Sequence, residues 1–204
     1  MSAANEPLTA EAARERLGRA VAWALAAHGD QVRKGTPVPY VSHLLQVSGL
    51  VLEHGGDLAQ AAAAVLHDVV EDTARTLADV EAAFGADIAA IVGDCTDTGE
   101  DEAPGRKRPW RERKTAYIAR LQHVGERSAL VIACDKLHNM RTQVADLEAL
   151  GVGVLARFNA PPEAQRWLHG ELLAALAGKV PPRLHAELEH LTERYRAGTA
   201  DGAA

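Results

Sequence analysis

An alanine-rich apolar run that ends in charged side chains sets the strongest limit on how this chain can fold. Residues 58–65 predict the body of a buried helix, and His67, Asp68, Glu71 and Asp72 follow it directly. These positions place an imidazole and three carboxylates on one helix face if the helix continues to residue 72. Burying so many ionisable groups is costly without compensation, and a divalent cation is the simplest one. A solvated helix end with scattered acids is the alternative interpretation.

Two further segments complete a candidate metal site. His43 stands near the start of a predicted helix, and Asp135 follows the apolar run 129–133. Two imidazoles with two carboxylates suit manganese, iron or zinc, and they argue against a structural site with sulfur ligands. Because long stretches of chain separate these residues, we expect the ligands to come from different helices of a bundle.

The fold class indicated by the sequence is all-α, in one compact domain with a central metal site. Alanine, leucine, glutamate and arginine dominate, and few stretches alternate with the period of a strand. A chain of 204 residues that is 47% hydrophobic can hold one sizeable core. We expect a domain over residues 9–196, with disordered ends at 1–8 and 197–204. The predicted helices are 9–28, 40–54, 57–72, 76–84, 86–95, 110–124, 127–149, 161–177 and 181–196.

Composition excludes several classes of protein. The net charge of −6 offers no general attraction for nucleic acid, and the apolar stretches are too short to span a bilayer. Two cysteines form no disulfide framework, and without an apolar signal segment a cytoplasmic location is expected. Cys134 is expected to pack in a helix, and His138 to have a surface or core role. A homo-oligomer remains open.

A short basic segment is the second candidate for function. Six cations stand within residues 106–114, after an acidic stretch. One interpretation is a solvated loop that pairs with its acidic neighbour. The other is a lid over a substrate polyphosphate, with contacts from Lys107, Arg111 and Lys114.

Four stretches carry a resemblance to a known family: residues 33–43 (RKGTPVPYVSH), 67–73 (HDVVEDT), 76–85 and 135–142 (DKLHNMRT). The chain resembles the HD-domain phosphohydrolases, in particular the hydrolase domain of the RelA/SpoT alarmone enzymes and their small stand-alone relatives. The resemblance implies a helical bundle of the HD-domain type. It also implies one manganese ion per chain, held by His43, His67, Asp68 and Asp135.

The same resemblance implies a reaction and a substrate. The residues that match Glu71 and Asp72 position and activate the attacking water in that family. Its members hydrolyse the 3′-pyrophosphate of guanosine tetra- or pentaphosphate, and some small members accept other nucleotides, including NADPH. Metal-assisted hydrolysis of a phosphate ester is therefore the expected chemistry.

Substrate contacts are expected from a second group of residues. Arg33 and Lys34 precede a rigid proline segment close to His43, and the resemblance places the arginine against the base. Lys136 and Asn139 follow Asp135 on one helix, and the residue that matches Asn139 contacts the ribose in the family. The sequence departs from the small family members before Trp167, where alanines replace a phosphate-binding arginine and tyrosine. Arg157 or Asn159 is the conjectured substitute.

Three alternative functions stay open at this point. A nucleoside 5′-monophosphatase of the wider superfamily shares the metal set but does not need Arg33 and Lys34. A cyclic-nucleotide diesterase often binds two metals through extra histidines, which are not evident here. A non-catalytic nucleotide sensor does not require the pair Glu71 and Asp72.

Overall fold

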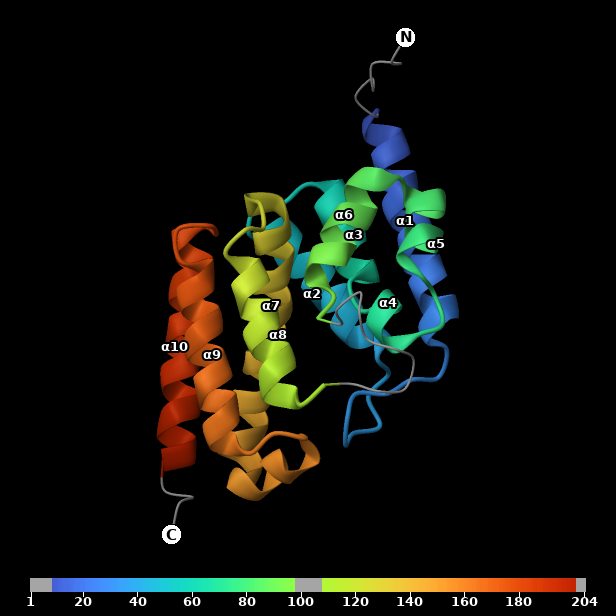
Figure 1. Ribbon diagram of the computed structural model, residues 1–204. Helices are drawn as coiled ribbons and strands as arrows, with labels where there is room; N and C mark the ends of the chain where they lie inside the picture. Colours follow the sequence, from blue (N-terminus) through green and yellow to red (C-terminus); the bar gives the residue numbers. More distant parts are fainter. Residues whose placement is uncertain (1–8, 98–107, 201–204) are drawn as a thin grey trace.

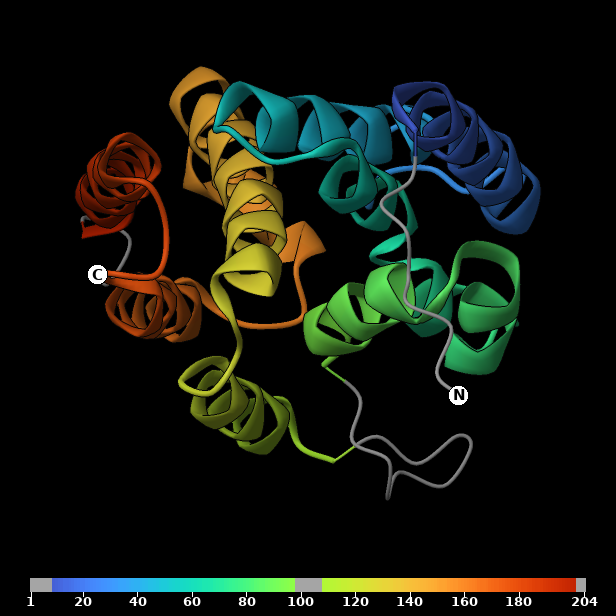
Figure 2. The same ribbon diagram turned by 90° about the horizontal axis from the view of Figure 1, so that it is seen from above.

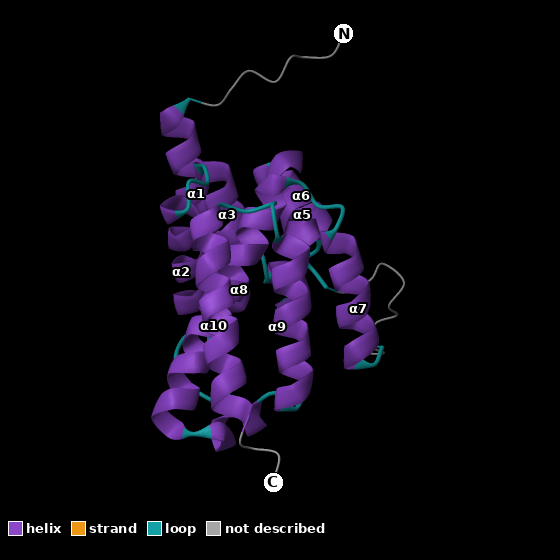
Figure 3. Ribbon diagram, turned by 90° about the vertical axis from the view of Figure 1, so that its left-hand side faces the viewer, coloured by secondary structure: helices purple, strands orange, loops and turns teal. Residues whose placement is uncertain are grey.

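Every regular element of the computed structural model, which describes residues 9–97 and 108–200, is a helix (Figures 1 and 3). One isolated β-bridge joins Val32 to Pro39. The elements are α1 (Ala10–His28), α2 (Val41–Glu53), α3 (Leu58–Leu66), α4 (Val69–Asp72), α5 (Leu77–Phe84), α6 (Ala86–Cys95), α7 (Trp110–Leu121), α8 (Glu126–Leu150), the 3₁₀ helix η1 (Val152–Arg157), α9 (Pro162–Leu176) and α10 (Pro182–Ala200). The all-α prediction is confirmed.

Helix boundaries differ from the predicted ones in three places. The predicted helix 57–72 is two helices, because the chain turns at His67 and Asp68 between α3 and α4. Residues 197–200, expected to belong to a disordered tail, continue α10 instead. η1 lies where no helix was predicted. The expected disordered segments 1–8 and 201–204 lie outside the described residues, as does the loop 98–107.

Small side chains let α3 pack closely against its neighbours. Asp57 begins α3 with a capping box that it forms with Gln60. The four alanines at positions 61–64 are fully buried, and α3 packs against α1, α2 and α6. α1 presents Ala20 and Ala24 on its own buried stripe. Because alanines stand in the middle of both buried faces, the two helices can pack closely there, and the chain after α3 is held deep in the molecule.

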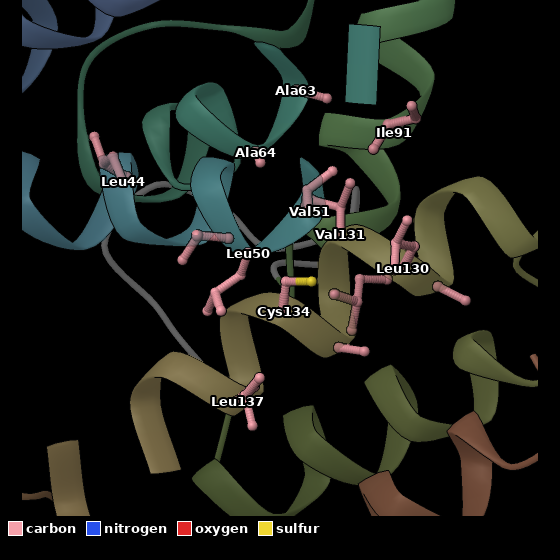
Figure 4. Close-up of a cluster of buried hydrophobic side chains, with 14 of the residues drawn as sticks. Leu44, Leu50, Val51, Ala63, Ala64, Ile91, Leu130, Val131, Cys134 and Leu137 are labelled. Carbon is pink, nitrogen blue, oxygen red and sulfur yellow. The ribbon is translucent and has the colours of Figure 1, made fainter. Parts of the chain in front are cut away.

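The long helix α8 connects the two halves of the molecule. It packs against α2, α3 and α6 on one side and against α10 on the other, as the view from above shows (Figure 2). α9 completes this second half by packing against α7 and α10. Figure 4 shows the cluster at the junction, formed by Leu44, Leu50, Val51, Ala63, Ala64, Ile91, Leu130, Val131, Cys134 and Leu137. No helix among the described residues is both long and apolar enough to cross a membrane.

Candidate metal centre and active site

The break between α3 and α4 brings two neighbouring side chains to one point. In a continuous helix, adjacent side chains diverge by about 100°. Here Asp68 has φ −98° and ψ −2°, outside regular α-helical values, and α4 starts only at Val69. His67 Nε2 and Asp68 Oδ2 consequently lie 2.8 Å apart. The expectation of four charged groups on one continuous helix face was therefore wrong, and the turn is what lets both residues serve one site.

Four predicted ligands converge at this turn. Ligand atoms of His43, His67 and Asp135 lie within 4.8 Å of one another, and all three residues are buried. Asp135 Oδ1 lies 3.2 Å from His43 Nε2 and 3.5 Å from His67 Nε2. Asp68 Oδ2 lies 3.6 Å from His43 Nε2. Two helices and one turn thus bring two imidazoles and two carboxylates together, in the combination expected from the sequence.

The orientation of the two imidazoles fits a bound cation. His67 Nδ1 donates to the carbonyl of Ala64 at 2.8 Å, which turns Nε2 toward the two carboxylates. His43 Nδ1 lies 2.7 Å from Nδ1 of His138. Within the described chain, His43 Nε2 and His67 Nε2 are buried without a hydrogen-bond partner. Asp68 and Asp135 raise the pKa of His67 although burial opposes this, so this point in the structure favours a positive charge, which a divalent cation supplies.

His138 supports the metal centre without belonging to the ligand set. It is buried on α8, three residues after Asp135, and burial together with neighbouring His43 and Arg33 lowers its pKa to about 4. A neutral His138 accepts a hydrogen bond from Nδ1 of His43, which leaves His43 Nε2 to coordinate a metal. The sequence indicated only a surface or core role. The contact joins α2 to α8, so no local pattern predicts it.

Tyr40 is a second residue that sequence reasoning missed. Its hydroxyl donates to Asp68 Oδ2 at 2.5 Å, and its ring stacks on His28 with 5.1 Å between centroids. Burial, followed by the charge of Asp68, raises the pKa of Tyr40 well above its usual range, so the hydroxyl remains a donor. Its position three residues before His43 in the sequence was the one available signal.

Glu71 lies beside the metal centre with an altered acidity. Burial, followed by the negative charges of Asp97 and Asp68, raises the pKa of Glu71 to about 7. Asp97 is buried and forms ion pairs with Arg113 and Lys114 of α7, which hold its pKa below the usual value although burial opposes this. A carboxyl group with a pKa near 7 can exchange protons with water at neutral pH. Asp97 was recognised in the sequence only as one of several acids before the basic segment.

A cavity of about 420 Å³ opens next to this centre. Asp72 and Tyr40 line it on the side of the ligands, and Arg33 and Lys34 line it from the segment before α2. Arg33 Nη2 donates to Asn139 Oδ1 at 2.7 Å. The remaining lining residues are Thr36, Val38, Ser42, Gln46, His138, Asn139, Thr142, Gln143, Asp146, Arg157 and Phe158. We call this space the large cavity.

The other predicted substrate residues differ in their contacts. Lys136 and Asn139 both donate to the carboxylate of Asp135, at 2.7 and 2.6 Å. Lys114 pairs with Asp97. Arg111 is exposed and stacks on Trp167, with Cζ 3.2 Å from the ring centroid, and it does not line the large cavity. Lys107 lies outside the described residues.

Two further expectations concern single residues. Arg157 lines the large cavity and pairs with Asp146, whereas Asn159 accepts a hydrogen bond from Lys34 at 2.6 Å. Arg157 is therefore the residue of the two that faces the cavity. Burial raises the pKa of the Cys134 thiol to about 12, which agrees with a packing role and not with a nucleophile.

Comparison with known proteins gives a consistent picture. Residues 20–152 match a family model described as HD domain. A probable guanosine-3′,5′-bis(diphosphate) 3′-pyrophosphohydrolase of Synechocystis sp. is 34% identical over 189 residues, which cover 87% of this chain and 22% of that protein. The guanosine-3′,5′-bis(diphosphate) 3′-pyrophosphohydrolase of Homo sapiens is 35% identical over 129 residues, covering 62% of this chain and 68% of that protein.

The Xenopus tropicalis protein of the same name is 37% identical over 117 residues, covering 56% of this chain and 62% of that protein. This chain thus spans about a fifth of the Synechocystis relative and about three fifths of the Xenopus one. One solved structure, described as a metazoan ortholog of SpoT that hydrolyzes ppGpp and plays a role in starvation responses, superposes with a TM-score of 0.70. It is 26% identical, and the match covers 94% of this chain and 98% of that one.

Proposed function

This chain belongs to the HD domain family, and we propose that it hydrolyses the 3′-diphosphate of guanosine tetra- or pentaphosphate or of a closely related purine nucleotide. The observation that carries the proposal is the placement of Glu71, with a pKa near 7, beside the four convergent ligands, together with the cavity lined by Tyr40, Asp72, Arg33 and Lys34. The names of the relatives give the substrate class.

A divalent metal belongs to this family's site, and we propose manganese as the ion. His43, His67, Asp68 and Asp135 would hold it, because their ligand atoms converge on one point and both imidazole Nε2 atoms are buried without a hydrogen-bond partner in the described chain. A mixed nitrogen and oxygen set suits manganese, iron or zinc. When bound, such a cation lowers the pKa of water and neutralises charge on a phosphoryl oxygen.

The chain's own residues supply the remaining chemistry. Glu71 takes a proton from the attacking water, whose oxygen forms a bond to the phosphorus next to the ribose. The bond between that phosphorus and the 3′ oxygen breaks, and the 3′ oxygen takes up a proton. Asp72, at the border of the large cavity, orients the water. The products are pyrophosphate and the nucleoside 5′-di- or triphosphate.

The large cavity is suited to the nucleoside and its 5′-phosphates. Its volume of about 420 Å³ falls within the range of ~300–1,000 Å³ that small-molecule sites have. Arg33, Lys34 and Arg157 bring three positive charges to its wall, against Asp72 and Asp146. A planar guanidinium can stack on a base or bind phosphate oxygens in pairs, and Arg33 is aligned for this by Asn139.

A nucleotide panel tests the proposal. The manganese-loaded protein is incubated with guanosine tetraphosphate, its adenosine analogue, NADPH and deoxynucleoside 5′-monophosphates, and the products are separated. We expect pyrophosphate, with no orthophosphate, from the first substrate and the highest kcat/KM for it. Faster release of orthophosphate from a 5′-monophosphate or from NADPH would replace the proposal with a phosphatase. Binding of nucleotide without any turnover would replace it with a sensor.

A further inference from the structure

A second cavity, which we call the small cavity, is lined by residues of α7, α8 and α9 and has a volume of about 120 Å³. Figures 1 and 2 show these three helices. It touches the metal centre through Lys136, which donates to the ligand Asp135 at 2.7 Å. Asn139 lines both cavities, so its side chain stands where they meet. The other lining residues are Lys114, Tyr117, Met140, Gln143, Gln165, Leu168, His169 and Leu172.

Buried polar atoms without partners distinguish the small cavity from a packing gap. Tyr117 is 2% exposed and His169 is 5% exposed. Within the described residues, Tyr117 Oη, His169 Nδ1 and Gln143 Oε1 are buried and make no hydrogen bond. Most buried polar atoms in proteins are hydrogen-bonded, so three unpaired ones around one space indicate a polar ligand.

The charge of the lining indicates that this ligand is an anion. Two lysines line the small cavity, and the described lining residues include no carboxylate. Lys136 pairs with Asp135 and Lys114 with Asp97, which fixes both ammonium groups in place. Each ammonium has three donor hydrogens, so each can bind a further oxygen. The oxygens of a phosphate group accept hydrogen bonds from donors of this kind, here one hydroxyl and two ammonium groups.

We propose that the small cavity binds the outer phosphate of the substrate's 3′-diphosphate, and holds the pyrophosphate until it departs. The inference rests on the proposed function and names a site for the part of the substrate that leaves. The volume of about 120 Å³, against about 420 Å³ for the large cavity, suits a phosphate group better than a nucleoside. The nucleoside then lies in the large cavity, and the scissile bond lies near Asn139 and Asp135, where the two cavities meet.

Equilibrium dialysis of labelled inorganic pyrophosphate against the manganese-loaded protein tests this assignment. The metal content is measured after each point, so that chelation is not mistaken for binding. We expect pyrophosphate to bind equally well when guanosine 5′-diphosphate saturates the large cavity. Tyr117→Phe keeps the ring and removes one donor to a charged ligand, so its affinity for pyrophosphate should fall roughly tenfold. Gln165→Leu, at a half-buried position of the same lining, gives a second and independent measure.

Tyr195→Phe is the matched control, because Tyr195 is also buried with an unpaired hydroxyl but does not line the small cavity. Its affinity should stay within twofold of the parent. Displacement of pyrophosphate by guanosine 5′-diphosphate, or parent-like binding by both Tyr117→Phe and Gln165→Leu, would overturn the assignment. The dialysis needs no turnover, so its outcome is independent of whether the proposed hydrolysis is found.

Discussion

Single hydrogen bonds determine what each imidazole at the metal centre can do. The carbonyl of Ala64 accepts a hydrogen bond from Nδ1 of His67, and the ring of His138 accepts one from Nδ1 of His43. These two bonds direct both Nε2 atoms to the same point. Partners of this kind orient metal-binding histidines and raise their basicity. Tyr40 does the corresponding work for Asp68 by donating to Oδ2.

Replacing His138 tests this arrangement. His138→Leu removes the acceptor for His43 Nδ1, so we expect metal affinity to fall about 10- to 100-fold. His138→Asn keeps a polar acceptor near the position of Nδ1 and should recover much of the loss. Metal titration followed by calorimetry measures both, with His54→Leu as the control at a buried histidine outside the site. Equal affinities for His138→Leu and His138→Asn would contradict a role for the acceptor.

The acidity of Glu71 predicts how activity depends on pH. Burial, Asp97 and Asp68 raise its pKa to about 7, and only the ionised carboxylate can accept a proton from water. A bound cation favours the ionised form and lowers this midpoint. At saturating metal, kcat/KM should therefore fall with acid below a midpoint that lies between 4.5, the ordinary value, and about 7. A profile that stays flat from pH 8 to below pH 4 would contradict the assignment of Glu71 as the base.

The same shift has a consequence for stability. Because the folded pKa exceeds the unfolded one, the folded state binds more protons between pH 4.5 and about 7, and stability falls as pH rises through this interval. Glu71→Gln removes the effect. Without metal, this variant should exceed the parent in unfolding free energy at pH 8, and the difference should shrink toward pH 4.

At the scale of helices, the turn between α3 and α4 separates what the sequence predicts from what it does not. The alanine run and the charged residues after it predicted a buried helix that carries the site, and in the structure Asp57 and Thr76 cap the helices that follow them. The periodicity continues smoothly through residues 67–68, so it gave no sign of the break. The break is stabilised by partners on other helices, which local propensity does not include.

Because α3 is closely packed, a larger side chain on its buried face should destabilise the fold. Ala64 is fully buried, and its carbonyl accepts from His67. Ala64→Leu overfills the contact between helices and should lower the free energy of unfolding by about 1–3 kcal/mol. Ala119→Leu, at an exposed position on α7, should change it by less than about 0.5 kcal/mol. Denaturant unfolding measures both, and equal effects would show that the space around Ala64 accommodates a leucine side chain.

On the scale of the whole molecule, the site joins segments that lie far apart in the chain. The candidate ligands come from α2, from the turn after α3 and from α8, and the small cavity adds α7 and α9. The sequence predicted the ligands because their residue types and order are distinctive. Tyr40, His138 and Asp97 were missed because their roles depend on partners 28, 95 and 26 residues away. Their meaning appears only when the helices are packed.

Metal binding should therefore stabilise the entire fold. A ligand that binds only the native state raises stability with its concentration. Added manganese should raise the unfolding temperature progressively, and a chelator should reverse the rise. Asp135→Ala should lose most of the response, whereas Arg141→Ala, which removes an ion pair between α8 and Glu187 of α10, should retain it. An unfolding temperature that does not respond to metal would indicate that the four residues bind none.

The turnover of Glu71→Gln at full metal occupancy tests the central claim most directly. The substitution keeps the shape of the side chain and removes its basicity, while His43, His67, Asp68 and Asp135 stay in place. We predict that the variant binds metal and guanosine tetraphosphate like the parent, with kcat lower by roughly 10²–10⁴-fold, the usual value of general-base help. Turnover within a few-fold of the parent, at equal metal content, would contradict the assignment and show that the water is activated by another group.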